Sequence, residues 1–200
     1  MVNKPKNKGT IAETAVVNYL CANGWPYAER RAQRGINDVG DVTGIPGLCM
    51  EVKYGNGGLK IGPWLAETGI ERLNSRAKHG ILIVKPGGLG VKSVGSWYAL
   101  MYSADFDVLC EDVIQNGGVI HVGMAIRQQF TSATLRALME SVPSHLRYAT
   151  EGAMAFVLQP PGTMDKPGSW YVALTLQHMV RLLHAAGYGT GESSESDPSA

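Results

Sequence analysis

The chain has 200 residues, of which 44% are apolar, and this suits one compact domain with an elaboration or two small domains. No apolar run approaches the roughly 20 residues that a membrane helix needs, and the N-terminal segment lacks the apolar stretch of a secretory signal. Three widely spaced cysteines argue against a disulfide framework and a zinc ribbon. We therefore expect a cytoplasmic protein with no membrane partner.

Charge is unevenly distributed along the chain. Residues 1–92 carry 13 Lys and Arg against 7 Asp and Glu, a net charge of +6, whereas residues 93–200 carry 5 against 10, a net charge of −5. The total of +1 conceals this difference. The basic first half predicts a polyanionic partner, and a solvated surface without special function is the alternative.

The first predicted element is a helix over residues 10–22. Thr10-x-x-Glu13 has the form of a capping box, and an Asn-Gly pair is a typical stop after the last turn. The capping role alone would explain Glu13, which is the alternative to a role in chemistry. A strand is predicted next, over residues 25–31.

The segment over residues 40–53 predicts two short strands joined at a Pro-Gly turn. In the second strand Glu51 and Lys53 share one face, while the apolar residues fall on the other. If the connection is a three-residue loop with Gly47 in the left-handed region, Asp41 comes directly opposite Glu51. A two-residue loop would place the residue after Asp41 there instead, so this pairing of carboxylates depends on the loop.

The chain continues with a helix over residues 63–78 and strands over 81–85 and 97–102, in the order α-β-β-β-α-β-β. Along the helix an i, i+4 row of apolar and small residues is formed by Leu65, Gly69, Leu73 and Ala77.

An internal repeat follows. The tetrapeptide Gly-Ser-Trp-Tyr at residues 95–98 recurs at 168–171, each time after an apolar strand and a Pro-Gly loop, which indicates a duplicated β-hairpin. The predicted divisions are a core over residues 1–103, an insertion over 104–152, the repeated hairpin with a C-terminal helix over 153–189, and a disordered acidic tail over 190–200.

Three acids and a lysine in the first half suit phosphodiester hydrolysis. Carboxylates such as Asp41 and Glu51 can hold Mg²⁺, which polarises a phosphoryl oxygen and lowers the pKa of bound water. Lys53 shares the face of Glu51 and can place an ammonium beside the attacking water or the phosphate. Glu13 can add a third carboxylate. Taken singly, each residue also fits an ordinary structural role, because alternating charges are common on exposed strands.

Residues 8–102 resemble the PD-(D/E)XK nuclease superfamily, and most closely its Holliday-junction-resolvase-like members of archaea and phages. The residues that carry the resemblance are Glu13 in the first helix, Gly40-Asp41-Val42, and Glu51-Val52-Lys53. The resemblance implies an α/β (α+β) fold with a restriction-endonuclease-like core, in which helices flank a central mixed β-sheet. The duplicated hairpin and the insertion would be additions in the C-terminal half.

The resemblance also implies roles for single residues. Glycine stands where the motif has proline, and Asp38 is an alternative to Asp41 as the metal-binding aspartate. The expected cofactor is Mg²⁺, for which Mn²⁺ substitutes. The expected catalytic residues are Glu13, Asp41, Glu51 and Lys53, and the expected metal ligands are Asp41, Glu51, the carbonyl of Val52 and Glu13.

The leading hypothesis is a homodimeric resolvase that cuts four-way DNA junctions by paired nicks, in the host cytoplasm if the protein is phage-encoded. The rivals are a nuclease of the same fold with another DNA substrate, of repair, replication or restriction type, and a non-catalytic DNA-binding protein. The residues expected to contact DNA phosphates are Lys4, Lys6, Lys8, Arg30, Arg31, Arg34, Lys60, Arg72 and Arg76.

Overall fold

The computed structural model describes residues 4–31, 38–55, 58–123, 132–141, 153–160, 163 and 166–189. Its elements in chain order are α1 (Lys4–Ala22), β1 (Glu29–Arg30), β2 (Val42–Thr43), β3 (Leu48–Tyr54), α2 (Ile61–Ser75), β4 (His79–Lys85), η1 (Val91–Ser96), β5 (Tyr98–Tyr102), α3 (Ser103–Gln115), β6 (Ile120–Gly123), α4 (Ser132–Glu140), β7 (Ala153–Leu158), η2 (Pro167–Ser169), β8 (Tyr171–Thr175) and α6 (Leu176–Ala185).

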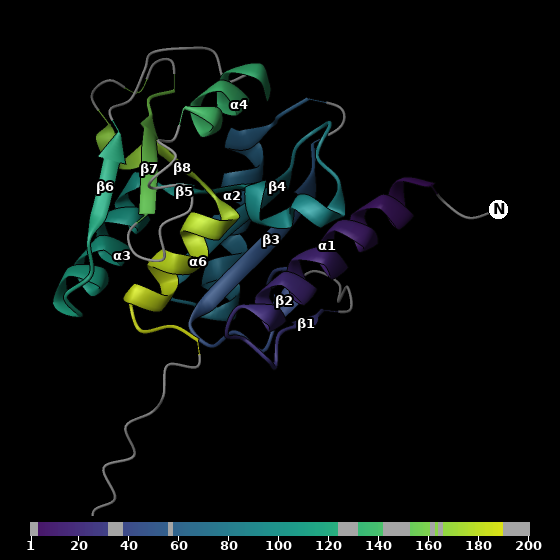
Figure 1. Cartoon of the computed structure of the whole chain (residues 1–200), viewed down its shortest axis with the longest axis horizontal. Helices are drawn as coiled ribbons and strands as arrows, with labels where there is room; N and C mark the ends of the chain where they lie inside the picture. The colour runs from purple at the N-terminus through teal and green to yellow at the C-terminus, as the bar shows by residue number, and fades with distance from the viewer. Residues whose placement is uncertain are drawn as a thin grey trace, which may run out of the picture.

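The centre of the molecule is a six-stranded mixed sheet in the order β3-β4-β5-β8-β7-β6. Helices α1 and α6 lie on one face of this sheet, and α2 lies on the opposite face (Figure 1). The expected central mixed sheet flanked by helices is therefore confirmed. None of the helices in the described ranges has the length and apolar character needed to cross a membrane.

Strand β4 anchors the core because all of its residues are buried. Ile81 and Ile83 pack with residues of α1, α3 and α6, whereas Leu82 and Val84 pack with residues of α2 and α4. An apolar run of this kind is typical of a strand covered on both faces. Strand β3 pairs in parallel with β4 and is the edge strand on this side among the described strands. Side chains from neighbouring described segments can therefore approach its other edge.

Helix α1 differs from its prediction at the N-terminus. It begins at Lys4 and not at Thr10, so Thr10 lies inside the helix. The predicted capping box is therefore wrong, because the box requires Thr10 to precede the first helical turn. The predicted end is confirmed, since the helix ends at Ala22 and Gly24, two residues later, has φ +98°.

The predicted pairing of the two strands around the Pro-Gly turn is only partly realised. Gly47 has φ +79°, as expected for the left-handed region, but the amide of Leu48 donates to the carbonyl of Ile45 and closes a tight turn. Strand β2 pairs with β1 and not with β3. The hydrogen bonds to β3 are made instead by Asp41, the residue that precedes β2.

Helix α2 buries a different face from the one its apolar row suggests. Leu65 is buried, but Leu73 is 67% exposed. The residues that face the sheet are Ile61, Leu65, Thr68 and Glu71. This helix therefore turns an acidic side chain toward β3, and the apolar row is wrong as the buried face.

The repeat is part of a larger approximate twofold relation between two halves of the sheet. In each half a parallel pair, β3 with β4 or β6 with β7, leads into an antiparallel pair, β4 with β5 or β7 with β8, and then into α3 or α6. The halves meet where β5 pairs with β8. The Trp97 carbonyl accepts from the Leu176 amide, and the Trp170 carbonyl accepts from the Ser103 amide, so the repeated tryptophans have matching contacts. The duplicated hairpin is confirmed.

Candidate active site

Asp41 is fixed at the free edge of β3 by two hydrogen bonds. Its amide donates to the carbonyl of Met50 over 2.9 Å, and its Oδ2 accepts from the amide of Val52, also over 2.9 Å. Because the N–H and C=O of one strand residue point to the same edge, the carbonyl of Val52 faces this edge as well. The structure thus brings together Asp41 and the backbone of Val52, one residue from Glu51.

Glu51 and Lys53 stand on the face of β3 that α2 covers. Glu51 is 5% exposed, and its Oε1 lies 2.6 Å from Nζ of Lys53. The same ammonium lies 2.9 Å from Oε2 of Glu67, which projects from α2. Glu51 and Lys53 share one face of β3, as expected. Helix α2 covers that face and buries Glu51.

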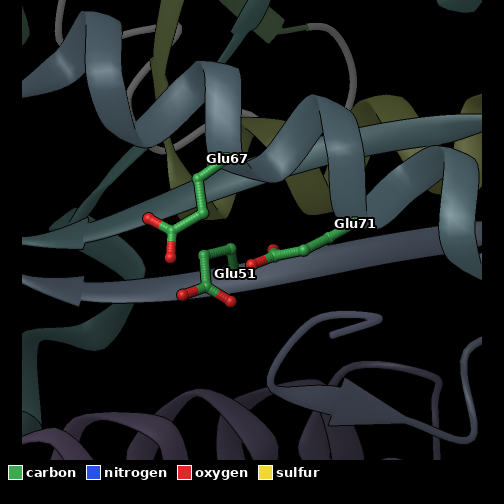
Figure 2. A group of neighbouring side chains, drawn as sticks. All are labelled: Glu51, Glu67 and Glu71. Atoms are coloured by element: carbon green, nitrogen blue, oxygen red, sulfur yellow. The ribbon is translucent and has the colours of Figure 1, made fainter. Parts of the chain in front are cut away.

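Two site residues were missed by the sequence analysis. Glu67 and Glu71 lie one turn apart on α2 and point toward Glu51, as Figure 2 shows. Each of the three offers a carboxylate oxygen within 4.8 Å of the others. The i, i+4 spacing of the two helical acids, directly after the Glu-x-Lys strand, was the signal that would have found them.

Burial and mutual repulsion perturb these carboxylates strongly. Burial raises the pKa of Asp41 to about 8, with further increases from the charges of Glu51 and Glu13 and a decrease from the Val52 amide. Burial also raises the pKa of Glu51 and of Glu71 to about 7 each. Carboxylates whose pKa values are raised by burial and by neighbouring negative charges are typical of functional sites.

Lys53 behaves in the opposite way. Burial lowers its pKa, but the bonds to Glu51 and Glu67 outweigh burial and raise the pKa above its ordinary value. Lys53 is therefore an ammonium at neutral pH and can act as a donor and a positive charge, not as a base.

Glu13 approaches the same edge from α1, on the other face of the sheet. Its Oε2 lies 3.2 Å from Nη1 of Arg30, and its charge contributes to the raised pKa of Asp41. Since the capping box does not form, helix capping no longer accounts for this residue. Glu13 has an ion-pair partner and a place beside Asp41 instead.

Asp38 lies near α2, where its charge contributes to the raised pKa of Glu71. Its side chain is exposed, with Oδ1 accepting from the amide of Val39, and its carbonyl accepts from Nδ2 of Asn74. Of the two candidate aspartates, Asp41 is the one that the structure places against Glu51.

The basic residues fall into three groups. Arg30 and Arg31 lie beside the site, because Arg30 pairs with Glu13 and the Arg31 amide donates to the Asp41 carbonyl. Lys8 Nζ lies 5.8 Å from the ring centre of Tyr54, at the end of β3. Arg72 contacts Asp105 and the Lys78 carbonyl, whereas Lys60 and Arg76 are exposed at the two ends of α2. Arg34 and the side chains of Lys4 and Lys6 lie outside the described residues.

The arrangement combines hard oxygen ligands with one fixed ammonium. Carboxylates and backbone carbonyls are the ligands that Mg²⁺ and Mn²⁺ prefer, so Asp41, Glu51 and the Val52 carbonyl fit such an ion chemically. The raised pKa values point the same way, because a bound cation would offset both the burial and the mutual repulsion that raise them. Comparisons with protein-family models, with curated proteins and with solved structures found no match for the chain.

Proposed function

We propose that the protein is a magnesium-dependent DNA endonuclease that cuts four-way junctions. One observation carries the proposal: Asp41 is tied to the Val52 amide beside a buried Glu51, whose carboxylate holds the ammonium of Lys53 at 2.6 Å. A protein that only binds DNA gains nothing from placing buried carboxylates where a polyanion must approach. The resemblance to PD-(D/E)XK nucleases supports the same assignment of these residues.

Asp41 and Glu51 would hold Mg²⁺ together with the carbonyl of Val52. When bound, the metal polarises the phosphoryl oxygen and lowers the pKa of water for attack. Lys53, which stays protonated, donates hydrogen bonds toward the phosphate and compensates the charge that develops on it. Glu13 keeps Arg30 in place at the mouth of the site, where the guanidinium can contact a neighbouring phosphate.

The internal twofold relation bears on the number of active sites. In the first half of the sheet, Leu82 of β4 pairs with Glu51 of β3 and with Leu100 of β5. In the second half, Phe156 of β7 pairs in the same way with Gly123 of β6 and with Ala173 of β8. Gly123 thus occupies the position of Glu51, and the second half has no carboxylate there. Paired nicks then require two chains, which supports a homodimer in which each protomer cuts one strand.

The test uses the full chain with three end-labelled substrates: a four-way junction, a duplex of matched sequence and a single strand, each in Mg²⁺ and in EDTA. Symmetric nicks in the junction alone, dependent on Mg²⁺, are expected. Cleavage of the duplex would move the proposal to a nuclease with another substrate. Binding without metal-dependent cleavage of any DNA would contradict the nuclease assignment.

A further inference from the structure

The three glutamates between β3 and α2 form a group separate from the Asp41 side of the site. Glu51 projects from β3, and Glu67 and Glu71 project from α2 toward it, so that the three carboxylates lie close together (Figure 2). Asp41 is at the free edge of β3, so Glu51 lies between two sets of acids.

Glu71 is the member that ordinary packing does not explain. It is 3% exposed, and its Oε2 has no hydrogen-bond partner among the described residues. A buried carboxylate oxygen without a hydrogen-bond partner destabilises the folded chain. Figure 2 shows the Glu71 carboxylate directed toward Glu51, where a positive ligand would satisfy the unpartnered oxygen.

Lys53 supplies a single positive charge to this group. Its ammonium bonds to Oε1 of Glu51 and Oε2 of Glu67, and leaves Oε2 of Glu71 unsatisfied. Three ionised carboxylates against one ammonium leave two negative charges, which is the charge of one divalent cation. Oxygen-only ligands favour Mg²⁺ or Mn²⁺ over softer metals.

We infer that Glu51, Glu67 and Glu71 form a second divalent-cation site, which shares Glu51 with the site of Asp41. The inference rests on the proposed function in one respect, which is that the Asp41 site binds the first cation. A second cation would weaken the hold of Glu51 and Glu67 on Lys53, whose ammonium could then share its N–H groups with the DNA phosphate. Two cations that share a carboxylate provide charge for both the attacking and the leaving oxygen.

The test is a Mn²⁺ titration of the full chain by calorimetry and by electron paramagnetic resonance, with Mg²⁺ as competitor. Wild type is expected to bind two ions per chain. Glu71→Gln is expected to bind one ion tightly and to bind the second ion at least about 10-fold more weakly than wild type does, in keeping with the loss of one ligand. Asp41→Asn is expected to keep the second site. Glu111→Gln removes an exposed carboxylate on α3 and serves as the matched control, with two ions bound.

Binding of one ion by wild type, or identical isotherms for wild type and Glu71→Gln, would overturn the second site. Those results leave the proposed function intact if the junction is still cut in Mg²⁺. Two ions bound without any cleavage of DNA would instead overturn the proposed function and leave the second site standing.

Discussion

Replacing Glu71 by glutamine makes a sharp prediction about stability. At an effective dielectric constant of about 20, two unit charges 4.8 Å apart repel by about 3.5 kcal/mol. The rise of the Glu71 pKa from 4.5 to about 7, of which burial is the largest cause, corresponds to about 3 kcal/mol at about 1.36 kcal/mol per unit. Both are upper bounds, because Lys53 attracts the same carboxylate and the side chains can relax.

The sign follows from proton binding. The pKa of Glu71 is higher in the folded than in the unfolded chain, so its stabilising proton is present below about pH 4.5 and is lost as the pH rises through about 7. Glu71→Gln removes that loss, and its amide can donate to Glu51. In EDTA at pH 8 we expect the variant to be more stable by about 2 kcal/mol, which raises Tm by about 4–8 °C for a chain of this size. At pH 4, below the unfolded pKa of Glu71, the two proteins should unfold alike.

The assay is thermal unfolding followed by circular dichroism, with Glu111→Gln as the exposed control, which should change stability by less than about 0.5 kcal/mol. A variant less stable than wild type at pH 8, or one stabilised equally at both pH values, would refute the reasoning. Mn²⁺ should reverse the order, since a cation that binds the folded state stabilises the protein with all its ligands more.

Three further outcomes are expected. Asp41→Asn should lower Mg²⁺-dependent cleavage at least about 100-fold while Asp38→Asn stays near wild type, and the reverse order would identify Asp38 as the ligand. Gly47→Ala should destabilise the fold by about 1–2 kcal/mol in chemical denaturation, because φ is +79° and the added Cβ would lie 3.0 Å from Tyr188. The control Gly69→Ala, in the middle of α2 where a Cβ has open space, should stabilise the fold by about 0.5–1 kcal/mol. Arg30→Gln should weaken junction binding and reduce its salt slope by about 1, and an unchanged slope would remove Arg30 from the DNA contacts.

The parts of the site that lie on one strand were predictable from the sequence. Alternation along β3 places Glu51 and Lys53 on one face whatever the rest of the chain does. Asp41 depended on the turn, and the structure reaches the same neighbourhood by another route, through hydrogen bonds to Met50 and Val52 and not through a strand pair.

The acids of α2 were not predicted because an apolar row suggested the wrong buried face. Leu73 is exposed and Glu71 is buried, so the helix is rotated relative to its hydrophobic pattern. Only the position of β3 beneath α2 gives a reason for this, since Glu71 meets Glu51 there. The hydrophobic pattern of one helix does not show which residues of the neighbouring strand it will contact.

The measurement that tests the central claim most directly is cleavage of the labelled four-way junction by wild type, Glu51→Gln and Lys53→Ala, with binding measured in parallel by gel shift. Wild type should nick the junction in Mg²⁺ and not in EDTA, and both variants should lose at least about 100-fold in rate while binding the junction as before. Cleavage that persists in EDTA, or full activity of Glu51→Gln, would contradict the account.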